Sequence, residues 1–204
     1  MLTRRALPWI VLVGICAALG GALLARMLSQ KPLALHSGTW LPQPRTLAPF
    51  RLADLDGLPY GNAQLQGHPT LVYFGFTYCP DLCPTTLALL HQSLQGAGAP
   101  PVQVLFVTVD PERDTPAVLR AYLAAFDARF RGLSGGAQAL APLLHSLNAI
   151  AERHELPGGS YTMDHSGTLY LLDAHGALRA VFSPPFDAAQ LRADLTQILA
   201  AADR

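Results

Sequence analysis

The sequence is poor in charge and has no excess of either sign. Asp, Glu, Lys and Arg make up 14% of its 204 residues, and 14 basic residues balance 14 acidic ones. A nucleic-acid-binding surface concentrates positive charge, so this composition argues against nucleic acid as a partner. Lysine is almost absent, since Lys31 is the only one. That bias towards arginine, with abundant Ala, Gly and Pro, indicates GC-rich coding and hence a bacterial source.

Charge is missing altogether from one long stretch near the N-terminus. No charged residue lies between Ala6 and Ala25, and an apolar helix of this length spans about 30 Å, the thickness of a bilayer core. The stretch exceeds a usual signal-peptide core and lacks a small-x-small cleavage site, which favours an uncleaved anchor. We therefore expect a single-pass protein of a bacterial inner membrane, with its soluble domain in the oxidising periplasm.

A less regular segment separates this stretch from the rest of the chain. Residues 28–46 contain three prolines and two serines and show little hydrophobic periodicity, which is typical of a linker. We expect a cytoplasmic tip and transmembrane anchor at residues 1–28, a proline-containing linker at 29–46 and one folded domain at 47–204. No internal repeat is present.

The apolar pattern of this domain alternates between strand and helix. Thr70–Phe76 and Val102–Val109 are nearly continuous apolar runs, as expected of buried central strands. The other expected elements are a strand at 50–55, a helix after Pro84, helices from Pro116 to about Phe126, at 137–151 and at 187–201, and a hairpin at 168–182. Strand, helix, strand, helix, hairpin, helix is, with additions, the order of the thioredoxin-like fold, an α/β architecture.

Cysteine is scarce, and only Cys79 and Cys83 lie outside the apolar N-terminal stretch. They stand four apart where a predicted strand meets a predicted helix, in a segment (residues 76–83) that we call the cysteine turn. Two thiols so placed can bind a soft metal, form a disulfide or do both in turn. Pro80 favours an extended Cys79, and Pro84 suits the first position of a helix with Cys83 as its N-cap. The positive end of a helix lowers a thiol pKa and favours the thiolate.

Cysteines also occur as plain core residues, but seldom as a proline-bracketed pair at such a turn. One of the seven histidines has a matching context. His165 lies just before the predicted hairpin, where a thioredoxin-like order brings a loop towards the cysteine turn. We expect the other histidines to be structural or solvent-exposed. Asp81 and Asp164 adjoin these candidates and either orient a ligand or adjust its charge, or are solvated turn residues.

Three segments in order carry a resemblance to a known family: Cys79-Pro-Asp-Leu-Cys83, Asp110-Pro-Glu-Arg-Asp-Thr-Pro116 and Asp164-His165-Ser166. Together they resemble the Sco/SenC family of copper-binding assembly proteins, over Phe50–Leu199. The resemblance implies a thioredoxin-like fold behind a membrane anchor, and copper ligands at Cys79, Cys83 and His165. Two thiolates suit Cu(I) and an added imidazole suits Cu(II), although zinc would accept the same set. In the middle segment, Asp114 or Thr115 is expected to cap the next helix.

The resemblance further implies a metallochaperone rather than an enzyme. Such a protein takes copper from a periplasmic donor and helps to load the binuclear copper site of cytochrome c oxidase subunit II. The alternative is a thiol–disulfide oxidoreductase that keeps the client's cysteines reduced through Cys79 and Cys83, although three residues between the cysteines depart from the usual two. A copper or redox sensor is a third reading, but nothing in the chain resembles an output domain.

Overall fold

The computed structural model describes residues 14–21 and 33–202. The chain divides into two compact units, Met1–Leu33 and Ala34–Arg204. In the first unit residues 14–21 are helical, and the rest of the predicted anchor at 1–28 lies outside the described residues. Across the described ranges, no helix combines the length and the hydrophobicity needed to cross a bilayer.

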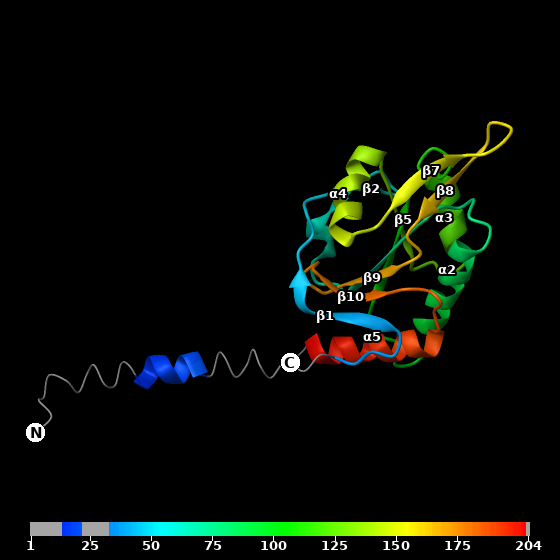
Figure 1. Cartoon of the computed structure of the whole chain (residues 1–204). Helices are drawn as coiled ribbons and strands as arrows, with labels where there is room; N and C mark the ends of the chain where they lie inside the picture. Colours follow the sequence, from blue (N-terminus) through cyan, green and yellow to red (C-terminus); the bar gives the residue numbers. More distant parts are fainter. Residues whose placement is uncertain (1–13, 22–32, 203–204) are drawn as a thin grey trace, which may run out of the picture. The chain divides into compact units, whose positions relative to one another are not determined.

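The second unit is built on one mixed sheet (Figure 1). Within residues 33–202 this sheet has eight strands in the order β1-β10-β9-β4-β5-β6-β2-β3, and β7 and β8 form a separate pair. The strands are β1 (Gly38–Arg45), β2 (Arg51–Asp54), β3 (Pro59–Gly61), β4 (Thr70–Gly75), β5 (Gln103–Thr108), β6 (Arg131–Ser134), β7 (Ala151–Glu155), β8 (Tyr161–His165), β9 (Leu169–Leu172) and β10 (Leu178–Phe182). In the large sheet β4, β5 and β6 run parallel, and the other pairings are antiparallel.

Helices cover both faces of this sheet. They are α2 (Leu82–Ser93), α3 (Pro116–Ala124), α4 (Ala137–Leu147) and α5 (Ala188–Ala202), with a short 3-10 helix at Asn62–Leu65. Figure 1 shows α4 on one side of the sheet and α2 and α3 on the other. All six residues of β4 are buried, because helices flank this strand on both faces. Val72 and Phe74 belong to the core beside α4, whereas the Tyr73 ring contacts Phe106 on the opposite face.

Residues 38–45 differ from the sequence prediction, which assigned them to the linker. They form β1, which pairs antiparallel with β10. The preceding residues are held by Asp194 of α5, a fully buried carboxylate that accepts hydrogen bonds from the backbone and the side chains of His36 and Ser37. The compact unit therefore begins at Ala34. β1 was missed because it is an edge strand with two prolines and mostly exposed side chains, which give little hydrophobic alternation.

The segment between α4 and β9 also differs from the prediction. Helix α4 ends at Leu147 rather than at Ala151, because Asn148 takes the left-handed conformation (φ 53°) that terminates helices. The chain then forms the β7–β8 hairpin, in which Ala151 is paired with His165. Figure 1 shows this hairpin projecting beyond the main sheet, with its loop at the far end. The hairpin sets the position of His165, the last residue of β8.

Candidate metal centre

The cysteine turn joins the buried end of β4 to the first turn of α2. Helix α2 begins at Leu82 with Asp81 as its N-cap, so Cys83 lies inside the helix. The predicted N-cap role of Cys83 is therefore wrong by two positions. Cys83 is fully buried and Cys79 is partly exposed, and both are free thiols. The Cys83 amide donates a hydrogen bond to the Cys79 sulfur over 3.4 Å, so a free N–H of the helix N-terminus faces that sulfur.

His165 approaches the cysteines from the hairpin. Its Nε2 lies 3.4 Å from the Cys83 sulfur, and its Nδ1 lies 3.2 Å from the backbone carbonyl oxygen of Ser166. Because a carbonyl can only accept, Nδ1 carries the proton in the neutral ring and Nε2 keeps its lone pair facing the sulfur. The rings of Tyr73 and Phe76 pack edge-on against the imidazole, with centroids 6.2 and 5.7 Å away. These contacts favour one tautomer and one orientation of this candidate ligand.

The three side chains together have the spacing of a metal site. One ligand atom each from Cys79, Cys83 and His165 lie within 4.8 Å of one another. Metal bonds of about 2.3 Å to sulfur and 2.0 Å to nitrogen, meeting at a tetrahedral angle, separate the two ligand atoms by about 3.5 Å. The observed 3.4 Å between Cys83 and His165 fits that value. Within residues 14–21 and 33–202, no other three His, Cys, Asp or Glu side chains form such a group.

Burial dominates the electrostatics of the centre. It raises the pKa of Cys83 to about 12, although a hydrogen bond from the Phe76 backbone acts in the opposite direction. The expectation that the helix end lowers this pKa is therefore wrong, because desolvation of a buried thiolate is the larger effect. Burial also lowers the pKa of His165, against smaller opposing contributions from Ser166 and Asp164. The metal-free centre thus holds a neutral buried thiol and a neutral imidazole, and binding a metal through Cys83 must release its proton.

A buried carboxylate supports the cysteine turn. Asp114 is fully buried and accepts hydrogen bonds from the Thr77 amide at 3.1 Å, the Thr77 hydroxyl at 2.6 Å and the Thr108 hydroxyl at 2.5 Å. These hydrogen bonds connect Thr77, two residues before Cys79 in the cysteine turn, to Thr108 at the end of β5. Thr115, and not Asp114, caps α3 by accepting from the Val118 amide. The sequence indicates this segment but not these hydrogen bonds, because the partners are far apart in sequence.

Arg113 links the turn to the hairpin that carries His165. Its guanidinium lies 4.8 Å from the centroid of the Tyr78 ring and 3.8 Å from that of Tyr161. It also pairs with Asp110 and donates to the Tyr161 carbonyl. Tyr161 in turn donates to Asp110 through its hydroxyl. The β5–α3 loop therefore holds both halves of the centre together.

The side chains of the two aspartates next to the ligand candidates have their closest partners elsewhere, although the charge of Asp164 also acts to raise the pKa of His165. Asp81 accepts a hydrogen bond from the Thr85 hydroxyl at the start of α2. Asp164 is exposed and lies 3.9 Å from Nε2 of His154. The hydrogen-bond partner that orients His165 is instead the Ser166 carbonyl, which no side-chain pattern could have revealed.

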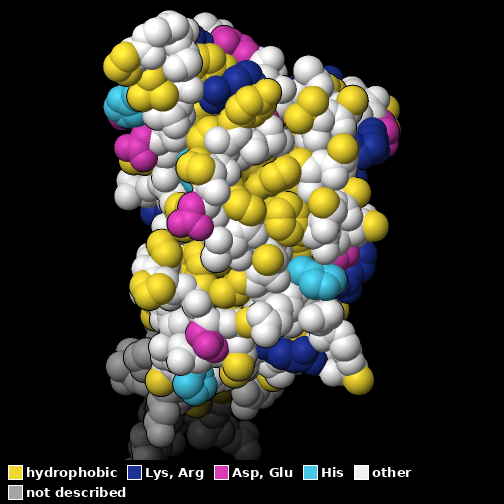
Figure 2. Space-filling view, turned by 90° about the vertical axis from the view of Figure 1, so that its right-hand side faces the viewer, with side chains coloured by type: hydrophobic (Ala, Val, Ile, Leu, Met, Phe, Trp, Pro, Cys, Tyr) yellow, Lys and Arg dark blue, Asp and Glu magenta, His cyan; other side chains and the backbone are white. Residues whose placement is uncertain are grey.

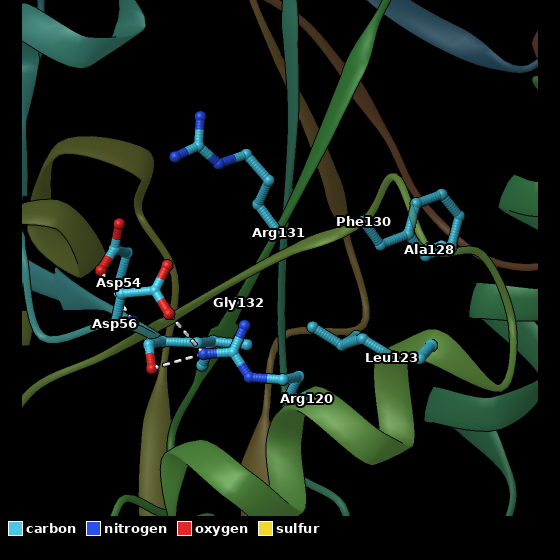
Figure 3. Close-up of a pocket in the computed structure, with 10 residues that line it drawn as sticks. Asp54, Asp56, Arg120, Leu123, Ala128, Phe130, Arg131 and Gly132 are labelled. Carbon is cyan, nitrogen blue, oxygen red and sulfur yellow. Dashed lines mark hydrogen bonds and ion pairs between the residues drawn. The ribbon is translucent and has the colours of Figure 1, made fainter.

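A separate hollow lies at the edge of the main sheet (Figure 3). Residues of β2, α3 and β6 line it, and Arg120 crosses it to bond the Leu55 carbonyl and Asp56. Arg120 and Asp56 therefore form an ion pair. None of the three ligand candidates lines this hollow.

The mixed sheet and the Cys-Cys-His group define a thioredoxin-like α/β domain with a candidate centre for a soft metal. Residues 40–200 match the family model described as SCO1/SenC. The chain belongs to this family, and the family prediction is confirmed.

Known relatives are similar in sequence or structure to most of this chain. A SCO2-like protein of Rickettsia felis is 34% identical over 158 residues, which cover 76% of this chain and 77% of that protein. The structure of Bradyrhizobium japonicum ScoI with copper bound is 38% identical, with a TM-score of 0.67, and the match covers 74% of this chain and 98% of that one. The crystal structure of yeast Sco1 with copper bound is 31% identical, with a TM-score of 0.68 and coverage of 78% and 90%.

Proposed function

We propose that this protein binds copper through Cys79, Cys83 and His165. The observation that carries the proposal is the convergence of two sulfurs and one imidazole nitrogen within 4.8 Å. Thiolates are soft ligands that suit Cu(I), and the imidazole extends the set to Cu(II). Two relatives of more than 30% identity have solved structures with copper bound, which supports copper over zinc.

The copper is cargo in this proposal, and the protein is a metallochaperone. It accepts copper from a periplasmic donor and passes it to a copper client, which we propose to be subunit II of a cytochrome c oxidase. Transfer by ligand exchange needs a ligand that a partner can reach, and Cys79 is partly exposed where Cys83 is buried. Tyr78 and Leu82 flank it with exposed fractions of 64% and 38%. Figure 2, viewed from the side of α2 and α3, shows hydrophobic side chains gathered on that face.

We also propose a membrane tether. The uncharged stretch Ala6–Ala25 has the composition and length of a single span, and most of it lies outside the described residues. A tether there would hold the compact unit that begins at Ala34 close to the membrane. The proposed location is the periplasmic face of a bacterial inner membrane.

A transfer experiment tests the chaperone role. Copper-loaded protein is mixed with the reduced, metal-free copper domain of an oxidase subunit II, and copper on each protein is measured after separation. A parallel sample keeps the two proteins on opposite sides of a dialysis membrane. We expect rapid transfer in the mixture and little across the membrane, because ligand exchange requires contact. Equal rates, or no transfer in either sample, would contradict the chaperone role.

One observation favours a second function, thiol–disulfide exchange. The sulfurs of Cys79 and Cys83 lie within 4.8 Å of each other, and the more exposed Cys79 faces a helix-end amide, as suits an attacking thiol with a buried partner. The two functions are compatible, because an oxidised pair has no two thiolates to offer copper. Copper affinity measured before and after disulfide formation tests this gating, and an unchanged affinity would refute it.

A further inference from the structure

The β7–β8 hairpin carries one of the three candidate ligands but lies outside the main sheet (Figure 1). Within the described part of the chain its strands pair only with each other, and a two-stranded hairpin is at best marginally stable by itself. Alternate side chains of a strand point to the same face. Tyr161, Met163 and His165 therefore share one face of β8. The position of His165 depends on how this face is attached to the rest of the compact unit.

Tyr161 attaches this face to the β5–α3 loop. Its hydroxyl donates to Asp110 over 2.8 Å, and its backbone carbonyl accepts from Arg113 over 3.0 Å. The guanidinium carbon of Arg113 lies 3.8 Å from the centroid of the Tyr161 ring, and that of Arg153 lies 3.6 Å from it. Two planar groups so close to one centroid cannot share a face of the ring without overlapping. The ring is therefore enclosed between two guanidiniums, one from the loop and one from the hairpin.

The charges of this arrangement are paired across the same contact. Arg113 pairs with Asp110 of its own loop, and Arg153 of the hairpin pairs with Glu112 of the loop over 3.0 Å. Asp110 is buried, so its carboxylate needs the positive partner that Arg113 supplies. We call Asp110, Glu112, Arg113, Arg153 and Tyr161 the tyrosine clasp. Arg113 is its central member, because it contacts both the ring and the buried carboxylate.

Arg113 also reaches the cysteine turn. Its guanidinium carbon lies 4.8 Å from the centroid of the Tyr78 ring and 5.8 Å from that of Phe76. Tyr78 directly precedes Cys79, and the Phe76 ring packs edge-on against the imidazole of His165. One guanidinium therefore contacts both the segment that carries the cysteines and the strand that carries the histidine.

We propose that Arg113 is a positioning residue that holds His165 against the cysteine turn and thereby sets the affinity of the centre for Cu(II). The selectivity follows from ligand chemistry, because two soft thiolates suit Cu(I) whereas the imidazole extends the set to Cu(II). Cys79 and Cys83 lie on one segment and keep their spacing when the clasp is broken, but His165 lies on the other side of it. Breaking the clasp therefore weakens Cu(II) binding and spares Cu(I) binding. The inference rests on the proposed copper site.

The chain offers a matched control in Arg179 of β10. Arg179 also lies over an aromatic ring, that of Trp40 at 4.3 Å, and beside an aspartate, Asp173 at 3.8 Å. The exposed fractions of the two arginine side chains are similar, at 23% for Arg113 and 17% for Arg179. Strand pairing places Arg179 near the start of β4, whereas the cysteine turn follows the end of that strand. A general effect of losing a stacked arginine would therefore appear in both glutamine variants.

The experiment uses full chains in detergent with Cys16→Ser, so that Cys79 and Cys83 are the only thiols. Affinities for Cu(I) and Cu(II) are measured separately, by competition with a chelator selective for each state, and the EPR spectrum of the Cu(II) form is recorded. Amide hydrogen exchange of β7 and β8 is measured on the metal-free proteins, because a hairpin detached from the body opens more often.

For Arg113→Gln we expect a loss of Cu(II) affinity of about tenfold, as is typical when a residue that orients a metal ligand is removed. The EPR spectrum should change, the hairpin amides should exchange faster, and Cu(I) affinity should match that of the parent protein. Tyr161→Phe removes only the hydrogen bond to Asp110 and keeps the stacked ring, so it should show the same pattern with a smaller loss. Arg179→Gln should match the parent protein in every measurement.

The possible failures are distinguishable. If the parent protein binds both copper states and Arg113→Gln keeps its Cu(II) affinity, Arg113 does not position His165, and this inference alone is overturned. Equal losses of Cu(I) and Cu(II) affinity in Arg113→Gln, or the same Cu(II) loss in Arg179→Gln, would also overturn it. If Arg113→Gln does not fold, an unchanged Cu(II) affinity in Tyr161→Phe overturns it instead. A parent protein that binds no copper would overturn the proposed function and this inference together.

Discussion

Replacing Asp114 by alanine tests how the fold holds the cysteine turn. The Asp114 carboxylate is the common acceptor for the amide and hydroxyl of Thr77 and for the hydroxyl of Thr108, at distances from 2.5 to 3.2 Å. All of these donors lose their partner in Asp114→Ala. The Thr77 amide cannot turn to a new acceptor, whereas the two hydroxyls can rotate.

The size of the effect follows from these contacts. Hydrogen bonds to a charged group contribute about 1.5–3 kcal/mol each, but they share one carboxylate and do not add. Removing the buried charge also relieves its desolvation, which offsets part of the loss. We expect a net destabilisation of about 2–4 kcal/mol, and for a domain of this size a Tm lower by roughly 4–16 °C. Thermal unfolding followed by circular dichroism measures this change.

The functional part of the prediction concerns copper. Without the hydrogen bonds from Thr77 to Asp114, the cysteine turn is no longer fixed at a point two residues before Cys79. We therefore expect copper affinity, measured by competition with a chelator, to fall at least about tenfold. Thr115→Ala is the matched control, because it removes only the α3 cap at Val118 and costs about 1 kcal/mol. It should leave copper affinity unchanged. If Asp114→Ala loses stability but binds copper as tightly as Thr115→Ala, Asp114 does not position the centre.

Two further predictions concern acid stability and close packing. Burial alone raises the pKa of Asp194, but hydrogen bonds from His36 and Ser37 outweigh it and hold that pKa below its ordinary value. The resulting stabilisation is present above the unfolded-state pKa of about 3.9 and is lost as pH falls through the lower folded-state value. The free energy of unfolding in urea, measured across this pH range, should depend less on pH in Asp194→Asn than in the parent protein. Identical pH dependence in the two proteins would contradict the stabilising role of the Asp194 carboxylate. A Cβ on Gly75 would lie 2.9 Å from the Cys83 sulfur. Gly75→Ala should therefore displace that sulfur and weaken copper binding. A copper titration identical to that of the parent protein would contradict this prediction.

Local chemistry explains what the sequence could predict. Prolines around Cys79 and Cys83 mark a strand-to-helix turn, and the structure has that turn between β4 and α2. The buried strands β4 and β5 could be predicted because a continuous apolar run is visible in the sequence without knowledge of which strands pair. The resemblance carried by three segments pointed to His165, and the structure brings all three side chains together.

Tertiary contacts explain what the sequence could not predict. Asp114 was one of two candidates for the cap of α3, but its partners lie on two other segments that only the fold brings near. The close approach that requires Gly75 involves Cys83 and Phe106, from two different elements. The pKa of Cys83 was predicted in the wrong direction, because helix-end effects are visible in a sequence whereas complete burial is a property of the packed core.

The most direct test of the central claim is an anaerobic copper titration of the reduced protein, followed by absorption and EPR, beside three variants. We predict one bound copper with sulfur-to-Cu(II) charge transfer. Cys79→Ser and Cys83→Ser should abolish binding of both oxidation states. His165→Ala should lose Cu(II) binding and charge transfer while keeping most Cu(I) binding, because two thiolates remain. Failure of the parent protein to bind copper, or equal loss of both states in His165→Ala, would contradict the Cys-Cys-His copper centre.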